Sequence, residues 1–291
     1  MRWRQMLPIV NRGILLIMLL LTLVGAASVA WAQEAVDINA AGFTIPVLAN
    51  GSRVDGTFQG PVTARLYGFQ GSAGDVVTVT MTQVSDQLDP FLVLLGADGE
   101  FIASDDDSGA TLLSAAIEDV TLPVDGAYLV LATSIHHVIE PRTEIPESLT
   151  FNLSLNGNTL PADADPAVLP LFVVPLEPGE PVAVTLGPEQ VAAYFSAPVG
   201  VDSAFGVTVE ESSFDTVLHL FDSTGARLAV NDDDASREGL ASGLYDAAVP
   251  TAGGALAIVS DVFFYMDDQD RTESEMRPFT GGDMSVLLQA G

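Results

Sequence analysis

The chain has 291 residues, with 39 acidic and ten basic side chains, a formal net charge of −29 and no cysteine. A surface this acidic repels nucleic acids and anionic lipids, which argues against both as partners. Without cysteine there is no disulfide framework and no cysteine nucleophile, so apolar packing alone has to hold the fold together.

The first 32 residues are typical of a secretory signal peptide. Arg2, Arg4 and Arg12 precede an apolar run over residues 14–24, and Ala30-Trp31-Ala32 offers small residues at the two positions that a signal peptidase reads. An uncleaved membrane anchor is the alternative interpretation. We expect cleavage after Ala32, which leaves 259 residues with seven Arg against 39 acids, and a secreted protein of the extracellular space or cell envelope. No second long apolar run follows, so the mature chain is not expected to cross a membrane.

Short segments rich in Val, Leu, Thr and Phe alternate with turn residues along the mature chain. Residues 76–80, 128–131 and 149–155 are examples, and long helical periods are absent. Many short strands at close spacing are typical of an all-β sandwich or barrel. Residues 91–95 are apolar at every position, which predicts an inner strand buried between two sheets.

One stretch of the sequence occurs twice at a constant offset of 126 positions. The first copy begins at Asp89-Pro90, continues through Asp98-Gly99 and ends in an acidic run. The second copy begins at Asp215, continues through Thr224-Gly225 and ends in a second acidic run. His219 takes the place of Val93. A fixed offset predicts two copies of one domain. We expect a first domain over residues 36–157, an extended linker over 158–166 and a second domain over 167–291.

Several short motifs of the first copy resemble one bacterial family. They are Tyr67 before a strand, Gly74-Asp75, Asp89-Pro90, Asp98-Gly99, the acidic run at Asp105, and the segment Pro123-Val124-Asp125-Gly126-Ala127-Tyr128. In this order they resemble the pre-peptidase C-terminal domain, which occurs beside secreted peptidases and is related to collagen-binding domains of bacterial collagenases. The second copy departs from the pattern, with Val201 where Gly is expected and Gly254 where Tyr is expected. The resemblance implies two tandem jelly-roll-like β-sandwich domains with a non-catalytic accessory or binding role.

The repeated acidic runs are the sharpest candidates for a binding site. The residues concerned are Asp89, Asp105, Asp106, Asp107, Asp215, Asn231, Asp232 and Asp233. Oxygen ligands on loops suit Ca²⁺, and adjacent carboxylates repel one another unless a cation neutralises them. The spacing of an EF-hand is absent. Two interpretations therefore stay open: a calcium site, or solvated turns whose Asp side chains accept hydrogen bonds from nearby backbone N–H groups.

No motif for catalysis appears in the sequence. Cysteine is absent, and there is neither a Gly-x-Ser-x-Gly elbow nor a His-Glu-x-x-His helix. The tripeptide Arg-Thr-Glu, which starts at Arg142 and again at Arg271, gives two candidate ligand contacts on loops. We therefore expect a secreted, non-catalytic protein that binds an extracellular polymer or protein partner and requires no cofactor apart from the calcium alternative. A structural envelope or matrix component is the second hypothesis, and a cryptic hydrolase is the third.

Overall fold

The computed structural model describes residues 35–38, 41–111, 113–137, 145–234, 240–262 and 279–290. These residues form strands and one short 3₁₀ turn, η1 (Ile135–His137). The strands are β1 (Val36–Asp37), β2 (Ser52–Gly60), β3 (Ala64–Gly71), β4 (Val76–Gln83), β5 (Pro90–Gly96), β6 (Phe101–Asp105), β7 (Ser114–Thr121), β8 (Gly126–Ser134), β9 (Ile145–Asn156), β10 (Pro170–Leu171), β11 (Val173–Pro175), β12 (Val182–Leu186), β13 (Ala192–Ala197), β14 (Ala204–Ser212), β15 (Thr216–Asp222), β16 (Arg227–Asn231), β17 (Gly243–Ala248), β18 (Ala255–Asp261) and β19 (Gly282–Ala290).

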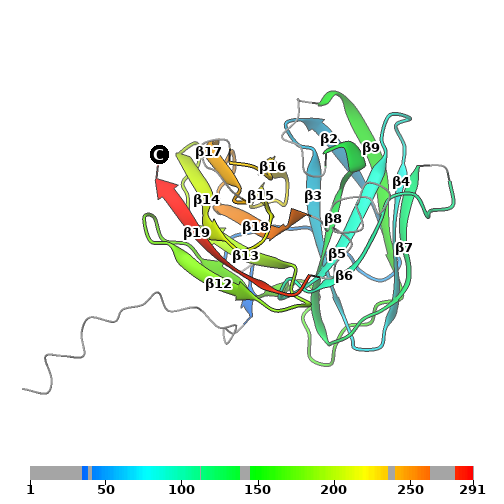
Figure 1. Ribbon diagram of the computed structural model, residues 1–291. Coiled ribbons are helices and arrows are strands. Elements are labelled where there is room, and N and C mark those ends of the chain that lie inside the picture. Colours follow the sequence, from blue (N-terminus) through cyan, green and yellow to red (C-terminus); the bar gives the residue numbers. More distant parts are fainter. Residues whose placement is uncertain are drawn as a thin grey trace, which may run out of the picture.

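These strands build two β-sandwiches that lie side by side (Figure 1). The first sandwich pairs an outer sheet, β2-β9-β4-β7, with an inner sheet, β3-β8-β5-β6. The second sandwich pairs an outer sheet, β12-β19-β14-β17, with an inner sheet, β11-β13-β18-β15-β16. Apart from the added edge strand β11, the two sandwiches have the same strand order, so the repeat in the sequence is a repeat of topology. The prediction of an all-β fold with two tandem sandwiches is confirmed.

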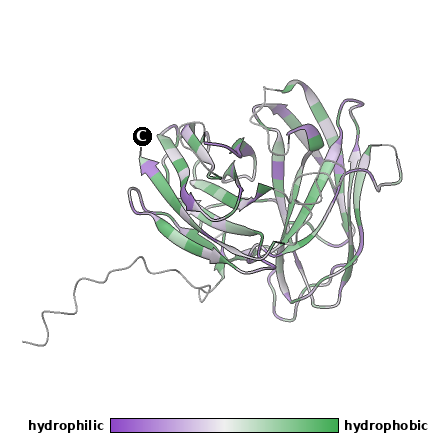
Figure 2. Ribbon diagram, in the orientation of Figure 1, coloured by the Kyte–Doolittle hydropathy of each residue, from purple (hydrophilic) through white to green (hydrophobic). Residues whose placement is uncertain are grey.

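Alternation of apolar and polar residues determines which face of each outer strand is buried. In β4, Val77, Val79 and Met81 are fully buried, and the Thr residues between them are only partly buried. A strand with this period-2 pattern buries one face and leaves the other to solvent. The inner strands differ, because every residue of β5, β15 and β18 is buried. Figure 2 shows the same contrast in hydropathy along the strands.

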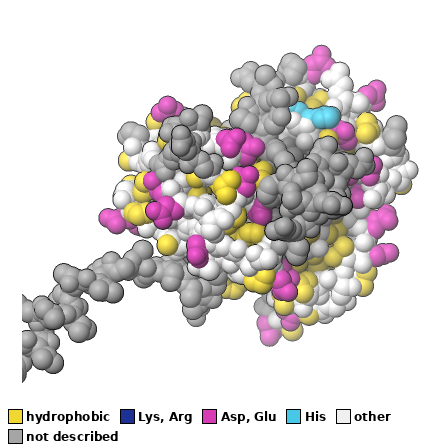
Figure 3. Space-filling view, viewed as in Figure 1, with side chains coloured by type: hydrophobic (Ala, Val, Ile, Leu, Met, Phe, Trp, Pro, Cys, Tyr) yellow, Lys and Arg dark blue, Asp and Glu magenta, His cyan; other side chains and the backbone are white. Residues whose placement is uncertain are grey.

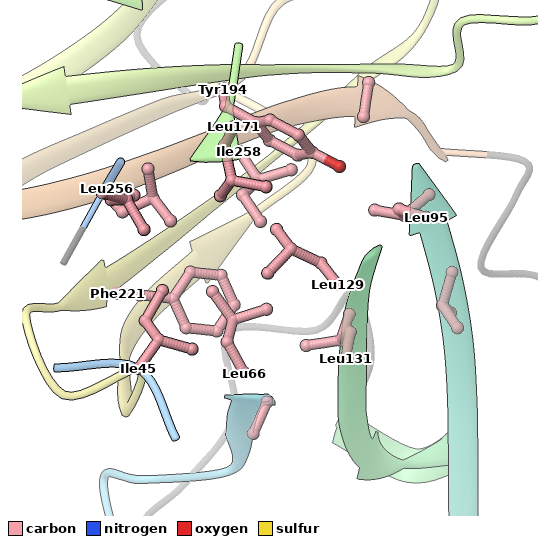
Figure 4. Close-up of a cluster of buried hydrophobic side chains, with 14 of the residues drawn as sticks. Ile45, Leu66, Leu95, Leu129, Leu131, Leu171, Tyr194, Phe221, Leu256 and Ile258 are labelled. Carbon is pink, nitrogen blue, oxygen red and sulfur yellow. The ribbon is translucent and has the colours of Figure 1, made fainter. Parts of the chain in front are cut away.

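A third apolar core, which we call the interface core, lies between the two sandwiches. Each sandwich has its own core, and the interface core is built from the opposite faces of the two inner sheets. Leu66, Leu129 and Leu131 of the first sandwich point toward Phe221 and Ile258 of the second (Figure 4). The order of layers is therefore outer sheet, inner sheet, inner sheet, outer sheet.

Two glycine turns add backbone hydrogen bonds across this interface. In the first sandwich the carbonyl oxygen of Gly99 accepts hydrogen bonds from the N–H groups of Val191 and Ala192, at 3.0 and 3.2 Å. In the second sandwich the carbonyl oxygen of Gly225 accepts one from Leu66 N–H at 2.8 Å. The two turns are the repeated Asp-Gly and Thr-Gly of the sequence, and both glycines have positive φ, as a left-handed turn requires.

The segments outside the sandwiches also cross or line the interface. The short strand β1, which we expected to belong to the first domain, pairs with β10, and Thr44 N–H donates to the carbonyl oxygen of Ser223 at 2.6 Å. The linker is not a free spacer. The side chain of Gln70 donates to the carbonyl oxygens of Asp165 and Val168, both at 2.6 Å. The linker therefore runs along the first sandwich.

Candidate functional site

The first residue of each acidic run ties the two sheets of its sandwich together. In the first sandwich Asp105, at the end of β6, accepts hydrogen bonds from Ser108 N–H at 3.1 Å and from Ala116 N–H of β7 at 2.6 Å. In the second sandwich Asn231, at the end of β16, donates to the carbonyl oxygen of Gly243 of β17 at 2.8 Å. Because β6 and β7 belong to different sheets, the repeated position has a structural role in both copies.

The remaining acidic residues gather more closely in the second copy. Partial burial and, after it, the charges of Asp233, Asp261 and Asp232 together raise the pKa of Asp215 to about 6. The surroundings of Asp89, which corresponds to Asp215 in the first copy, are different. Ser134 stands where the second copy has Asp261, and Oδ2 of Asp89 lies 3.6 Å from Nε2 of His136. Among the described residues, the charges of Asp232, Asp233 and Asp261 therefore act on Asp215, whereas Asp89 lies beside His136.

The geometry for a metal is not assembled in the described part of the chain. There, no group of three or more His, Cys, Asp and Glu side chains is placed to hold an ion. Asp106 and Asp107 follow Asp105 on the loop, and Asp107 is exposed. Arg142, Arg271 and the signal peptide lie outside the described residues. The calcium interpretation therefore stays a prediction.

Replacing Asp215, whose pKa is raised to about 6, should show how much its negative charge destabilises the folded protein. We expect Asp215→Asn to raise the melting temperature at pH 7.5 by about 3–5 °C, which corresponds to about 1–2 kcal/mol after allowance for solvent screening of a half-exposed group. Native Asp215 holds its proton up to about pH 6, whereas in the unfolded chain it ionises near 3.8. The penalty is therefore absent at low pH and develops as the pH rises from about 4 to 6. Melting curves of both proteins at pH 4 and pH 7.5 measure it.

The same variant separates calcium binding from simple repulsion. If the acidic cluster binds Ca²⁺, millimolar Ca²⁺ raises the melting temperature of the natural protein at pH 7.5, because a ligand of the native state stabilises it. The rise disappears in Asp215→Asn and with chelator. A melting temperature that does not respond to Ca²⁺ contradicts the calcium prediction. A variant that is no more stable than the natural protein at pH 7.5 contradicts the electrostatic argument.

The outer sheet of the first sandwich presents an ordered face of uncharged polar side chains over residues 78–82 of β4 and 150–156 of β9. On β4 and β9 the residues opposite the core are Thr78, Thr80, Thr82, Thr150, Asn152, Ser154 and Asn156. Register places Thr78 opposite Asn156, Thr80 opposite Ser154, and Thr82 opposite Asn152. We call this set the polar face. Its hydroxyl and amide groups repeat at the spacing of strands and of alternate residues, about 4.8 by 6.7 Å.

The polar face stands out against the rest of this protein. Acidic side chains are scattered over the side of the molecule drawn in Figure 3. At the edge of the face, Arg53 and Asp55 of β2 are both hydrogen-bonded to Asn152, with 2.5 Å between Asn152 Nδ2 and Asp55 Oδ1. The sequence contains the signal for this face in the alternation Val-Thr-Val-Thr and Phe-Asn-Leu-Ser-Leu-Asn. This alternation predicts strands from the sequence, but the residues on its polar side were missed as candidate site residues.

No family model and no curated protein matches the chain. Among solved structures, a pre-peptidase C-terminal domain of a collagenase from Bacillus anthracis matches at 12% identity and TM-score 0.31, covering 39% of this chain and 96% of that domain. A periplasmic inhibitor of g-type lysozyme from Aeromonas hydrophila matches at 17% identity and TM-score 0.27, covering 39% of this chain and 96% of the inhibitor.

The class that the fold defines is a tandem β-sandwich protein. The family that the sequence motifs resemble, the pre-peptidase C-terminal domain, is also represented among the structural matches. At these identities and TM-scores the matches carry no information about what this chain binds. Among the described residues, no helix is long and apolar enough to span a bilayer.

Proposed function

We propose that this chain is an exported, non-catalytic binding protein whose two sandwiches act as one body and whose polar face contacts an extracellular polymer. The polar face is the observation that carries the proposal. The inner sheets are buried against each other, so neither offers an open sheet face to a polymer. The outer sheet of the first sandwich remains available. A regular array of hydroxyl and amide groups can donate and accept hydrogen bonds along an extended, hydroxylated or amide-rich chain.

Charge supports a neutral polymer in preference to an acidic one. The formal net charge of −29 repels polyanions at long range. The seven residues of the polar face carry no charge, and Glu147 of β9 and Asp119 of β7 lie outside this set, so a neutral chain can approach the face without an unpaired ion being desolvated. Cellulose, chitin and collagen are therefore the first polymers to test. Peptidoglycan, which carries carboxylates, shows whether an acidic polymer is also bound.

Retention on insoluble polymers tests the proposal directly. We expect the chain from residue 33 onward to sediment with at least one of cellulose, chitin, collagen or peptidoglycan in buffer of physiological ionic strength. An equally acidic globular protein of unrelated fold serves as the control for adhesion through charge. No retention on any polymer and no capture of a secreted protein would favour the hypothesis of a structural component without a specific ligand.

A single charge placed on the polar face should abolish retention. In Thr80→Glu a carboxylate stands at the middle row, opposite Ser154, where a bound chain would have to desolvate it. We expect binding to fall by at least about tenfold, with a change in melting temperature of only a few degrees because the site faces solvent. The matched control is Ser203→Glu, which adds the same charge at an exposed loop residue of the second sandwich. Equal retention of the two variants would remove the polar face from the proposal.

A further inference from the structure

A cavity of about 370 Å³ opens where β2 and β3 separate at one edge of the first sandwich. Its lining comes mainly from these two strands, and Thr224, in the glycine turn of the second sandwich, also lines it. Cavities of this size at a boundary between domains are common sites for small ligands or for one group of a larger ligand. Its walls include Asp55, Thr57, Arg65 and Tyr67. Asp55 and Thr57 lie on the outward side of β2, so the cavity borders the sheet that carries the polar face.

Arg65 supplies the positive charge of this cavity. Its Nε atom donates to the carbonyl oxygen of Thr57 at 2.9 Å, which fixes the guanidinium group across the gap between the two strands. Among the described residues, no carboxylate lies within ion-pair distance of Arg65 and no acceptor is hydrogen-bonded to its Nη atoms. A guanidinium held in this way keeps a fork of N–H donors for a ligand.

Tyr67 supplies a second donor. Its side chain is only 4% exposed, and within the described part of the chain its hydroxyl makes no hydrogen bond to another residue. Burial raises the pKa of Tyr67, while the charge of Arg65 acts to lower it. The phenol therefore stays protonated at neutral pH. The hydroxyl oxygen is not among the buried side-chain atoms that lack a partner, so it borders the cavity and can donate to a ligand acceptor there.

We infer that this cavity binds a carboxylate group, which accepts hydrogen bonds from the Nη atoms of Arg65 and from the hydroxyl of Tyr67. A carboxylate matches the planar fork of a guanidinium in shape and charge. Asp55 also lines the cavity. Its negative charge disfavours a dianion such as phosphate, so the site fits a monoanion. The inference rests on the proposed function only for the origin of the carboxylate, which would be part of an extracellular ligand.

Calorimetric titration with small probes tests the inference on the full mature chain. N-acetylalanine and glucuronate represent a peptide terminus and an acidic sugar, and N-acetylalaninamide and glucose are their uncharged counterparts. We expect saturable binding of at least one acid and none of its uncharged counterpart. The acid that binds more tightly identifies the source of the carboxylate. Equal binding of acid and uncharged counterpart, or no binding of either acid, overturns the inference.

Three variants connect any binding to this cavity. Arg65→Gln should weaken binding of the acid by at least about tenfold, and Tyr67→Phe by several-fold, because a charged and a neutral donor are lost respectively. Ser203→Glu is the control, since it makes the same change in net charge at an exposed loop residue of the second sandwich outside the cavity and should leave binding unchanged. Equal losses in Arg65→Gln and Ser203→Glu would show a general effect of charge and overturn the assignment.

The two proposals fail independently of each other. If the natural protein is retained on a polymer but binds neither acid, the cavity inference is wrong and the proposed function stands. If it binds an acid through Arg65 but is retained on no polymer, the cavity inference stands and the proposed function is wrong. Melting curves of each variant confirm that a lost signal reflects binding and not unfolding.

Discussion

Gly99→Ala is expected to lower the melting temperature by about 10 °C, which corresponds to about 3–5 kcal/mol for a chain of this size. Gly99 has a φ of +86°, where any other L-residue is strained. A Cβ atom at this position would lie 1.9 Å from the carbonyl oxygen of Ala192, across the interface. Since the obstacle is backbone, it cannot rotate away, and the turn has to withdraw from the second sandwich. Scanning calorimetry measures the loss.

Gly74→Ala is the matched control for this prediction. Gly74 lies in the same sandwich with a φ of +84°, but its Cβ position has no atom within 4 Å. The substitution should therefore cost only the backbone strain, about 1 kcal/mol or about 3 °C. If the two variants melt alike, contact between the sandwiches contributes nothing to stability. Limited proteolysis of the linker offers a second measurement, because the linker should become susceptible only in Gly99→Ala.

Arg227→Ala is expected to lower the melting temperature by about 9 °C, or about 3 kcal/mol, through a cavity and broken hydrogen bonds. Arg227 is 1% exposed and lies between the sandwiches. Its guanidinium donates to the hydroxyl of Thr63, with 3.1 Å from Nε, and to the carbonyl oxygen of His137. Nη1 lies 3.4 Å from Nδ1 of His219. Burial, and then the charge of Arg227, lowers the pKa of His219 well below its usual value, so this ring stays neutral.

The repeat itself supplies the control for Arg227. In the first copy the places of His219 and Arg227 are taken by Val93 and Phe101, which pack against the same interface core. The double variant His219→Val with Arg227→Phe should melt within about 3 °C of the natural protein, because an apolar pair of similar volume replaces a buried polar one. A double variant as unstable as Arg227→Ala would show that the polar contacts themselves, and not only volume, are required here.

Much of the fold could be predicted from the sequence because its signals are local. Alternation in β4 and unbroken apolar character in β5 follow from the period of a strand and from the number of its buried faces. The offset of 126 aligns β5 with β15 and β6 with β16, which share the same pairing register. Asp98-Gly99 and Thr224-Gly225, which recur at the same offset, form equivalent turns with a glycine at positive φ. None of these inferences required knowledge of distant contacts.

The correspondence between the copies could not be extended from sequence to every strand. Tyr67 and Tyr194 look equivalent, but Tyr67 packs in the core of the first sandwich and Tyr194 in the interface core. By register, Tyr194 takes the place of Leu66. A shift of one residue along a strand moves a side chain to the opposite face.

At the candidate site, too, part of the arrangement was visible in the sequence and part depends on the tertiary structure. The repetition of the acidic runs was visible in the sequence, but the hydrogen bond from Ala116 N–H to Asp105 and the crowding of Asp232, Asp233 and Asp261 around Asp215 depend on strands that are distant in sequence. Arg65 and Tyr67 were equally visible as residues within an apolar strand. Only the separation of β2 from β3 shows that they line a cavity.

The sequence by itself determined the strand-built class, the duplication and the two glycine turns, since these depend on residue period and on backbone conformations that few residues adopt. Only the tertiary structure decided that the inner sheets pack against each other into a third core, which side of each inner strand faces it, and where an uncharged face and a cavity remain. The physical reason is that an apolar residue specifies burial without specifying its partner. The partner is chosen by the register and packing of strands that meet only in the folded chain.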